Sequence, residues 1–252
     1  MTISCRTFPG GANTDVLTSS TTISLTDNLR SWCAWVNISS LDATRRRIAH
    51  AESGNNGDEY DLDNTNGFHT LQGFSGGYAG WKASTAFPTT GSWLFIALAF
   101  DGSSASNTPS IWFGNTAQSV TNFQASSGSL GTGSVGNQYI GNRGDGTRCF
   151  NGSIAMVARW EGYQLVQADV DQLAAGVAPC AIHLAYLFGY YPLDAGNSPE
   201  PDLVYGNNAT VTGTTVGTGP SSVTTPRCQY GMTGSASTSG IGTLPPGISV
   251  NL

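Results

Sequence analysis

The chain has few charged residues and no long apolar run, and each shortage excludes a class of function. Charged residues make up 10% of the sequence, against roughly 25% in an average soluble domain. There are ten basic and sixteen acidic residues, and Lys82 is the single lysine. Nucleic acid is therefore not expected as a partner, because phosphate binding needs a broad basic surface. No segment approaches the roughly 20 apolar residues of a membrane span, so no membrane partner is expected either.

Histidine is scarce and cysteine is scattered, which argues against several kinds of reactive site. Only three histidines are present, and chance combinations of Ser, His and Asp carry no information in a chain so rich in serine, so nothing indicates a serine hydrolase. The five cysteines are widely spaced and form no Cys-x-x-Cys pair, so a structural zinc site is unsupported. We expect free, buried thiols, with the redox state of the cysteines left open.

Glycine is abundant instead, and the chain contains 33 glycines and 11 prolines. This composition favours short strands joined by tight turns. The run from Trp93 to Phe100 is nearly continuous in apolar residues, which is typical of a central strand covered on both faces. Only 167–175 has helical spacing, and Gly176 is a natural stop. These patterns predict an all-β fold, a two-sheet antiparallel jelly-roll sandwich with one short helix.

The two ends of the chain are poor in large apolar residues. We therefore predict an N-terminal arm over residues 1–20, a jelly-roll domain over 21–212 and a C-terminal arm over 213–252. Extended arms on a compact domain suggest assembly, so the arm after Gly213 is the expected partner-binding segment and a homo-oligomer is the expected state.

Three segments, in order, resemble the laminin-G-like branch of the concanavalin A-like lectin/glucanase superfamily. They read LRSWCAWVN, TTGSWLFIALAFDG and NQYIGNRGDGTRCFNGSIAMVARWEGYQLVQADVDQLAAG. The first is similar to an early strand of that family, the second to its central strand, and the third to its closing unit with a short helix. The resemblance covers about residues 20–178 and implies a concanavalin A-like sandwich.

A fourth segment, LAYLFGYYPLDAGNSPEPDLVYGNNATVTGT, is similar to an extension found on such domains in bacteriophage sequences. This resemblance implies a non-enzymatic virion surface protein, such as a capsid decoration protein, which binds neighbouring virion subunits. It also implies assembly in the host cytoplasm, which agrees with the lack of a secretory signal at Met1 to Arg6. The alternative is a carbohydrate-binding module or adhesin that recognises host-surface glycans.

The sharpest enzymatic candidate is the segment Glu59-Tyr60-Asp61-Leu62-Asp63. In a strand, residues 59, 61 and 63 point to one face. The resemblance implies a retaining, laminarinase-like glycoside hydrolase, whose members carry Glu-x-Asp-x-Glu there. Asp63 stands where the acid/base glutamate should be, and its shorter side chain would sit back from the leaving oxygen. We therefore predict no enzymatic activity and interpret the segment as the solvated polar face of an edge strand.

Two binding sites can be proposed from residue types alone. Asp58, Asp61 and Asp63 crowd one stretch and offer the hard oxygen ligands that Ca²⁺ prefers, although turn formation is their default role and no cofactor is otherwise expected. Tyr78, Trp81 and Phe87 lie in a stretch typical of a loop, where exposed rings would form a glycan-binding platform.

Overall fold

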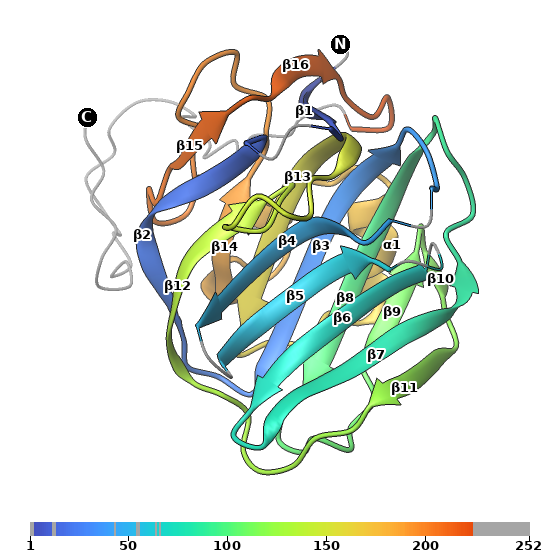
Figure 1. The fold of residues 1–252 in the computed structure, drawn as a ribbon, viewed down its shortest axis with the longest axis vertical. Helices are drawn as coiled ribbons and strands as arrows, with labels where there is room; N and C mark the ends of the chain where they lie inside the picture. Colours follow the sequence, from blue (N-terminus) through green and yellow to red (C-terminus); the bar gives the residue numbers. More distant parts are fainter. Residues whose placement is uncertain are drawn as a thin grey trace, which may run out of the picture.

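Two antiparallel β-sheets stack face to face, which confirms the predicted jelly-roll sandwich (Figure 1). The structure is a computed structural model that describes residues 3–11, 14–42, 44–53, 56–63, 65 and 67–223. In Figure 1 the second sheet lies in front of the first.

The first sheet contains β1 (Ser4–Pro9), β3 (Leu29–Ile38), β8 (Trp93–Asp101), β9 (Ser110–Phe113), β10 (Thr116–Ala117), β13 (Asn151–Glu161), β14 (Leu187–Tyr191) and β16 (Thr215–Thr218). Its order is β10-β9-β8-β3-β13-β1-β16, and β14 also pairs with β13. The second sheet contains β2 (Val16–Leu25), β4 (Arg46–Ser53), β5 (Asn56–Leu62), β6 (Gly67–Phe74), β7 (Gly77–Ala86), β11 (Val120–Gln124), β12 (Gly133–Ile140) and β15 (Ala209–Thr212). Its order is β11-β7-β6-β5-β4-β12-β2-β15.

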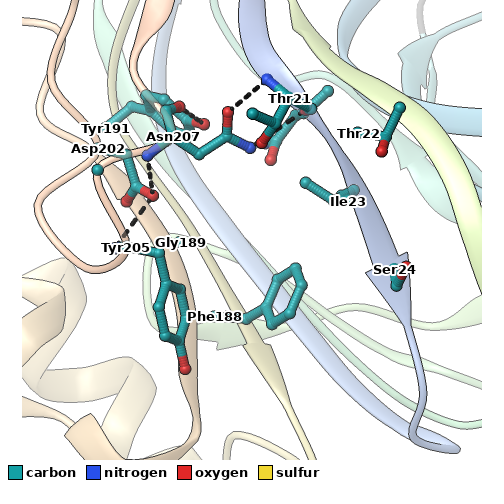
Figure 2. A pocket seen from close by; sticks show the side chains of 12 residues that line it. Thr21, Thr22, Ile23, Ser24, Phe188, Gly189, Tyr191, Asp202, Tyr205 and Asn207 are labelled. Atoms are coloured by element: carbon teal, nitrogen blue, oxygen red, sulfur yellow. Dashed lines mark hydrogen bonds between the residues drawn. The ribbon is translucent and has the colours of Figure 1, made fainter. Parts of the chain in front are cut away.

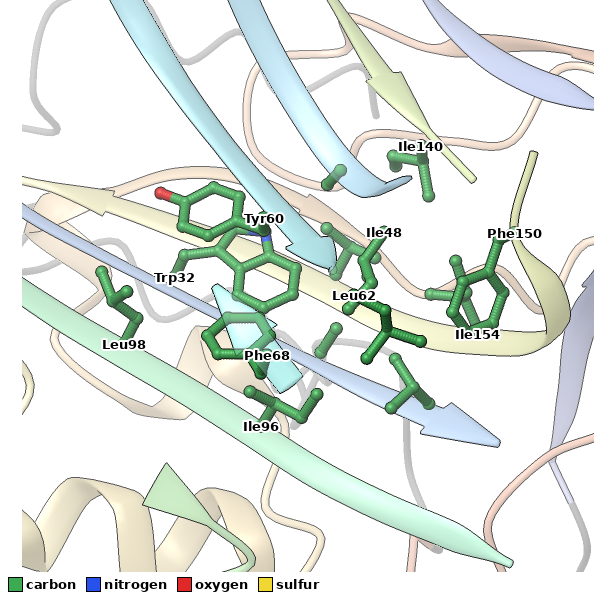
Figure 3. Close-up of a cluster of buried hydrophobic side chains, with 14 of the residues drawn as sticks. Trp32, Ile48, Tyr60, Leu62, Phe68, Ile96, Leu98, Ile140, Phe150 and Ile154 are labelled. Carbon is green, nitrogen blue, oxygen red and sulfur yellow. The ribbon is translucent and has the colours of Figure 1, made fainter. Parts of the chain in front are cut away.

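The core between the sheets is built from aromatic and aliphatic side chains (Figure 3). Trp32 of β3 stacks on Tyr60 of β5 with ring centroids 4.4 Å apart and planes inclined by 8°. Phe68 of β6 continues the stack on the same tryptophan at 6.4 Å. Such wide rings bury a large apolar area and hold the facing strands at a fixed spacing.

β8 is covered on both faces, as its unbroken apolar run predicts. Ile96 and Leu98 belong to the core between the sheets, whereas Phe95 and Ala97 belong to a second apolar cluster on the other side. Helix α1 (Gln167–Ala174) covers that side and contributes Val170 and Leu173. It ends before Gly176, so the predicted helix and its stop are confirmed. No helix in the described part of the chain is long and apolar enough to cross a membrane.

The predicted arms are partly wrong. β1 lies between β13 and β16, and the first half of β2 pairs with β15, so residues 4–9 and 16–20 are parts of the sheets. Short strands such as β1 carry too few apolar residues to stand out in sequence, yet ladders on both sides stabilise them here. On the C-terminal side, residues 215–218 form β16, and residues 224–252 lie outside the described residues.

The cysteines follow the expectation only in part. Cys5, Cys33 and Cys149 are free and buried, as expected. Cys180, in contrast, takes part in a disulfide. Cys228 lies outside the described residues.

Candidate functional site

The segment Glu59-Tyr60-Asp61 lies in the middle of the second sheet, not at its edge. β5 pairs with β4 on one side and with β6 on the other. Tyr60 and Leu62 point into the core, so Glu59 and Asp61 point to the outer face of the sheet. They are nevertheless 5% and 0% exposed. The expectation of a solvated edge strand is therefore wrong, because other side chains cover these carboxylates.

Arginines provide that cover. Arg47 of β4 is fully buried, with its Nη1 2.6 Å from Glu59 Oε2 and its Nε 2.8 Å from Asp61 Oδ1. Arg45 contacts the same two carboxylates: its Nη2 lies 2.8 Å from Glu59 Oε2 and its Nε 2.7 Å from Asp61 Oδ2. Arg148 approaches both carboxylates at 3.5–3.6 Å from the loop before β13. Three guanidinium groups thus surround two carboxylates on this face.

We call Arg45, Arg47, Arg148, Glu59 and Asp61 the charged layer. Burial and these charges shift the pKa values of side chains in and beside it. Burial raises the pKa of Asp61 to about 6, although Arg47 and Arg45 act to lower it. Burial lowers the pKa of His69 to about 3, and the neighbouring Arg45 adds to that effect. Burial and Arg47 likewise lower the pKa of His50 to about 3. Both imidazoles are therefore neutral at neutral pH, and neither offers a proton as an imidazolium.

Asp63 serves the turn between β5 and β6. Its Oδ1 accepts hydrogen bonds from the backbone N–H of Thr65, at 2.7 Å, and of Gly67, at 2.9 Å. The Thr65 hydroxyl donates to the same oxygen. Partial burial acts to raise the pKa of Asp63, but these hydrogen bonds outweigh it and the pKa is lowered. Asp63 is thus ionised at neutral pH and cannot supply the proton that a general acid must give.

Beside the charged layer, a pocket of about 420 Å³ opens on the same face. We call it the Phe123 pocket; its lining consists of Arg45, Asp63, Thr65, His69, Leu71, Lys82, Phe123 and Gln124. The Phe123 side chain is 46% exposed, and its ring packs edge-on to His69 at 5.5 Å. A Cβ at Gly80 would lie 2.6 Å from Phe123 Cζ, so the absence of a side chain at Gly80 makes room for the ring.

The structure does not bring the predicted calcium ligands together. Asp58 points into the core and pairs with Arg159, whereas Asp61 points outward to Arg45 and Arg47. Asp63 holds its own turn. The described residues contain no group of three acidic, histidine or cysteine side chains arranged for a metal ion. A strand sends neighbouring residues to opposite faces, and the compact spacing in sequence concealed this.

The predicted glycan platform is also wrong in its main residues. Trp81 and Phe87 are 1% and 3% exposed and belong to the core. Tyr78 is half-buried at the start of β7, and its hydroxyl donates to the carbonyl of Asn56. The glycine-rich stretch is typical of a loop, but it forms β7, in which Trp81 takes an inward position, and Phe87 enters the core just after the strand ends.

No pattern in the sequence indicates a functional role for Phe123 or Arg148. Phe123 is one aromatic residue in a polar stretch, and Arg148 comes from a glycine-rich loop far along the chain. Arg45-Arg46-Arg47 is the one basic run of the sequence. Only the pairing of β4 with β5 shows that its outer members neutralise Glu59 and Asp61.

A family model described as the concanavalin A-like lectin/glucanases superfamily matches residues 10–171. The chain therefore belongs to this superfamily. No curated protein matches the sequence.

Solved structures agree on the fold. A candidate carbohydrate-binding protein from Bacteroides ovatus is 17% identical with a TM-score of 0.61, and the match covers 86% of this chain and 60% of that protein. This chain thus corresponds to less than two thirds of that structure. A heptameric SAP-like pentraxin from Limulus polyphemus is 13% identical with a TM-score of 0.51, over 68% of this chain and 82% of the pentraxin.

Proposed function

We propose that this chain binds carbohydrate at the Phe123 pocket without cleaving it. The observation that carries the proposal is the half-exposed Phe123 ring, which lies over Gly80 beside Arg45 and Lys82. An aromatic face next to fixed polar groups suits a sugar, because the ring contacts the C–H face while the polar groups bind hydroxyls.

Donors for a ligand remain in this pocket. Arg45 uses its Nε and Nη2 on Asp61 and Glu59, and its Nη1 has no partner among the described residues. The Lys82 ammonium lines the pocket and makes no hydrogen bond or ion pair within the described part of the chain. Because Arg45 is already held by two carboxylates, binding a ligand costs little further side-chain entropy.

The local charge favours an acidic sugar. Arg45, Arg47, Arg148 and Lys82 supply four positive charges, against three carboxylates from Glu59, Asp61 and Asp63. This face is thus slightly positive on a chain whose net charge is -6. A uronic acid unit would place its carboxylate near the free Arg45 and Lys82 donors and its ring on Phe123.

Binding without hydrolysis follows from the state of the carboxylates. Retaining cleavage needs a protonated acid and a free nucleophile. Glu59 is paired with arginines, and Asp63 is ionised by the hydrogen bonds of its turn. The structure from Bacteroides ovatus, described as a candidate carbohydrate-binding protein, adds support from the fold. A virion partner and location, implied by the phage-like extension, stay a prediction.

Titration calorimetry with oligogalacturonate and oligoalginate tests the proposal. The wild-type protein should bind at least one of them, and Phe123→Ala should weaken binding at least tenfold, or about 1.4 kcal/mol. Lys82→Gln should weaken binding and reduce its dependence on salt. Val216→Ala, which trims a similarly exposed side chain on β16, is the matched control and should bind as the wild type does.

Two outcomes would contradict the proposal. Failure of the wild-type protein to bind either acidic oligosaccharide removes the binding function. A rise in reducing ends that disappears in Glu59→Gln would mean that the site is catalytic.

A further inference from the structure

A second hollow, of about 390 Å³, lies between β2 and β14 (Figure 2). Thr21 to Ser24 of β2 line one side, and Phe188 of β14 with Tyr205 lines the other. Its C-terminal wall comes from residues 188–207, which lie beyond the segment 10–171 that matches the family model. We call this hollow the Tyr205 groove.

The wall that carries Tyr205 is held rigidly by Asp202. Oδ1 of Asp202 accepts the backbone N–H groups of Tyr190 and Val204, at 3.0 and 3.1 Å. Its Oδ2 accepts those of Tyr205 and Asn207, at 3.2 and 3.3 Å. Four backbone donors therefore occupy this carboxylate, which leaves it little capacity to attract a cation into the groove.

Asn207 ties the same wall to the opposite sheet. Its Oδ1 accepts from the backbone N–H of Thr21 at 2.8 Å, and its Nδ2 donates to the Thr21 carbonyl (Figure 2). The hydroxyl of Tyr191 donates to the Asn207 carbonyl at 2.7 Å. The groove thus exists before any ligand arrives, which lowers the ordering cost of binding.

Aromatic and uncharged polar groups face each other across this fixed groove. Tyr205 is 64% exposed and packs edge-on to Phe188 at 6.0 Å. Gln138 lines the groove and is 5% exposed, and its side-chain amide is not among the fully buried, unpaired groups of the described residues. A side chain held in the wall with its amide end open to the groove can exchange water for a ligand. A ligand that both donates and accepts would match both ends of this amide.

We infer that the Tyr205 groove binds a neutral saccharide unit. The amide of Gln138 pairs well with neighbouring hydroxyls of a sugar, since it offers one donor group and one acceptor. The exposed ring of Tyr205 supplies the stacking face, and the hydroxyls of Thr22 and Ser24 line the opposite side. Among the described residues, no basic side chain lines the groove and its one acid is occupied, so a charged sugar gains nothing from them. This site stands apart from the Phe123 pocket and requires a different ligand.

Binding is tested with uncharged hexasaccharides, namely laminarihexaose, cellohexaose, maltohexaose and xylohexaose, by titration calorimetry. The wild-type chain should bind at least one. Tyr205→Ala and Gln138→Leu should each reduce its association constant at least tenfold, whereas Phe123→Ala should leave it within twofold. Amide NMR shifts on titration should concentrate at residues 21–24 and 188–207.

The thermal midpoint of Tyr205→Ala should stay near that of the wild type, because the ring is mostly exposed, so lost binding would not reflect unfolding. The inference is overturned if no hexasaccharide binds, or if Tyr205→Ala binds as tightly as the wild type. Equal losses in Phe123→Ala would also overturn it, since the sugar would then occupy the other pocket. Absence of hexasaccharide binding would leave oligogalacturonate binding at the Phe123 pocket unaffected, so each proposal can be contradicted without the other.

Discussion

Arg159 of β13 and Asp58 of β5 form a bidentate ion pair that joins the two sheets through the core. The two N–O distances are 2.6 and 2.7 Å, and the side chains are 1% and 0% exposed. The Tyr60 hydroxyl donates to Asp58 at 2.9 Å, so the carboxylate is well satisfied. Burial acts to lower the pKa of Arg159, but Asp58 outweighs it and the pKa is raised. The guanidinium therefore stays charged inside the sandwich.

We predict that Asp58→Asn destabilises the fold by about 3–5 kcal/mol, because it leaves the buried charge of Arg159 without a partner. Urea unfolding followed by tryptophan fluorescence measures this loss. The double variant with Arg159→Gln should lose less than the sum of the two single variants, since neither charge is then stranded. A loss below about 1 kcal/mol in Asp58→Asn would mean that the pair is not important to the fold.

Trp81→Ala should destabilise the fold by about 3–5 kcal/mol, as expected for removing a buried large side chain. Trp81 is 1% exposed and packs against Phe100 at 4.9 Å. Phe123→Ala, on the outer face, should change the free energy of unfolding by less than about 0.5 kcal/mol. Chemical denaturation of both variants separates a core ring from a binding ring, and equal losses would contradict the placement of the two rings.

These two rings show how far sequence reasoning reaches. Alternation and glycine content predict the sandwich, and the central strand and helix fall where expected, because those signals are local. The direction of a ring depends on strand pairing, which is not local: the stretch around Trp81 has the composition of a loop but pairs with β6 and β11. The charged layer was hidden for the same reason, since Arg148 meets Glu59 only after the chain has crossed several strands.

Gly80→Ala should weaken acidic-oligosaccharide binding several-fold without touching a ligand donor. The new Cβ would lie 2.6 Å from Phe123 Cζ and 2.8 Å from Leu71 Cδ2, so the Phe123 ring must move away from residue 80. The backbone at Gly80 is not left-handed and accepts alanine, so stability should change little. Calorimetric titration of this variant with oligogalacturonate is the measurement, and wild-type affinity would show that the position of the ring does not matter.

The free energy of unfolding should decrease as the pH is lowered from 6.5 to 4, because the buried histidines are neutral only in the folded state. The pKa of His69 is about 3 when folded, against roughly 6.5 when unfolded. The contribution of His69 to the free energy of unfolding is therefore fully present above pH 6.5 and is lost as the pH falls toward 3. The sign is opposite for Asp61, whose folded pKa of about 6 lies above its unfolded value, so its contribution is lost as the pH rises through 6.

His69→Gln isolates one of these protons. In that pH range the slope of unfolding free energy against pH should decrease by about 1.4 kcal/mol per pH unit relative to the wild type. His50→Gln should give a similar change, since burial lowers the pKa of His50 to about 3 as well. Urea midpoints at several pH values provide the slopes, and parallel curves for wild type and variants would contradict the neutral, buried state of these side chains.

The alternation of acids along β5 also determines how this strand aligns with its neighbours. Asp58 points inward to Arg159, while Glu59 and Asp61 point outward to Arg45 and Arg47. If β5 slipped by one residue, Glu59 and Asp61 would enter the apolar core, and Tyr60 and Leu62 would face solvent. Each acid would then lie away from its arginine. Misaligned pairing during folding would therefore bury unpaired charges as well as lose apolar contacts. Both costs favour a single register for β5.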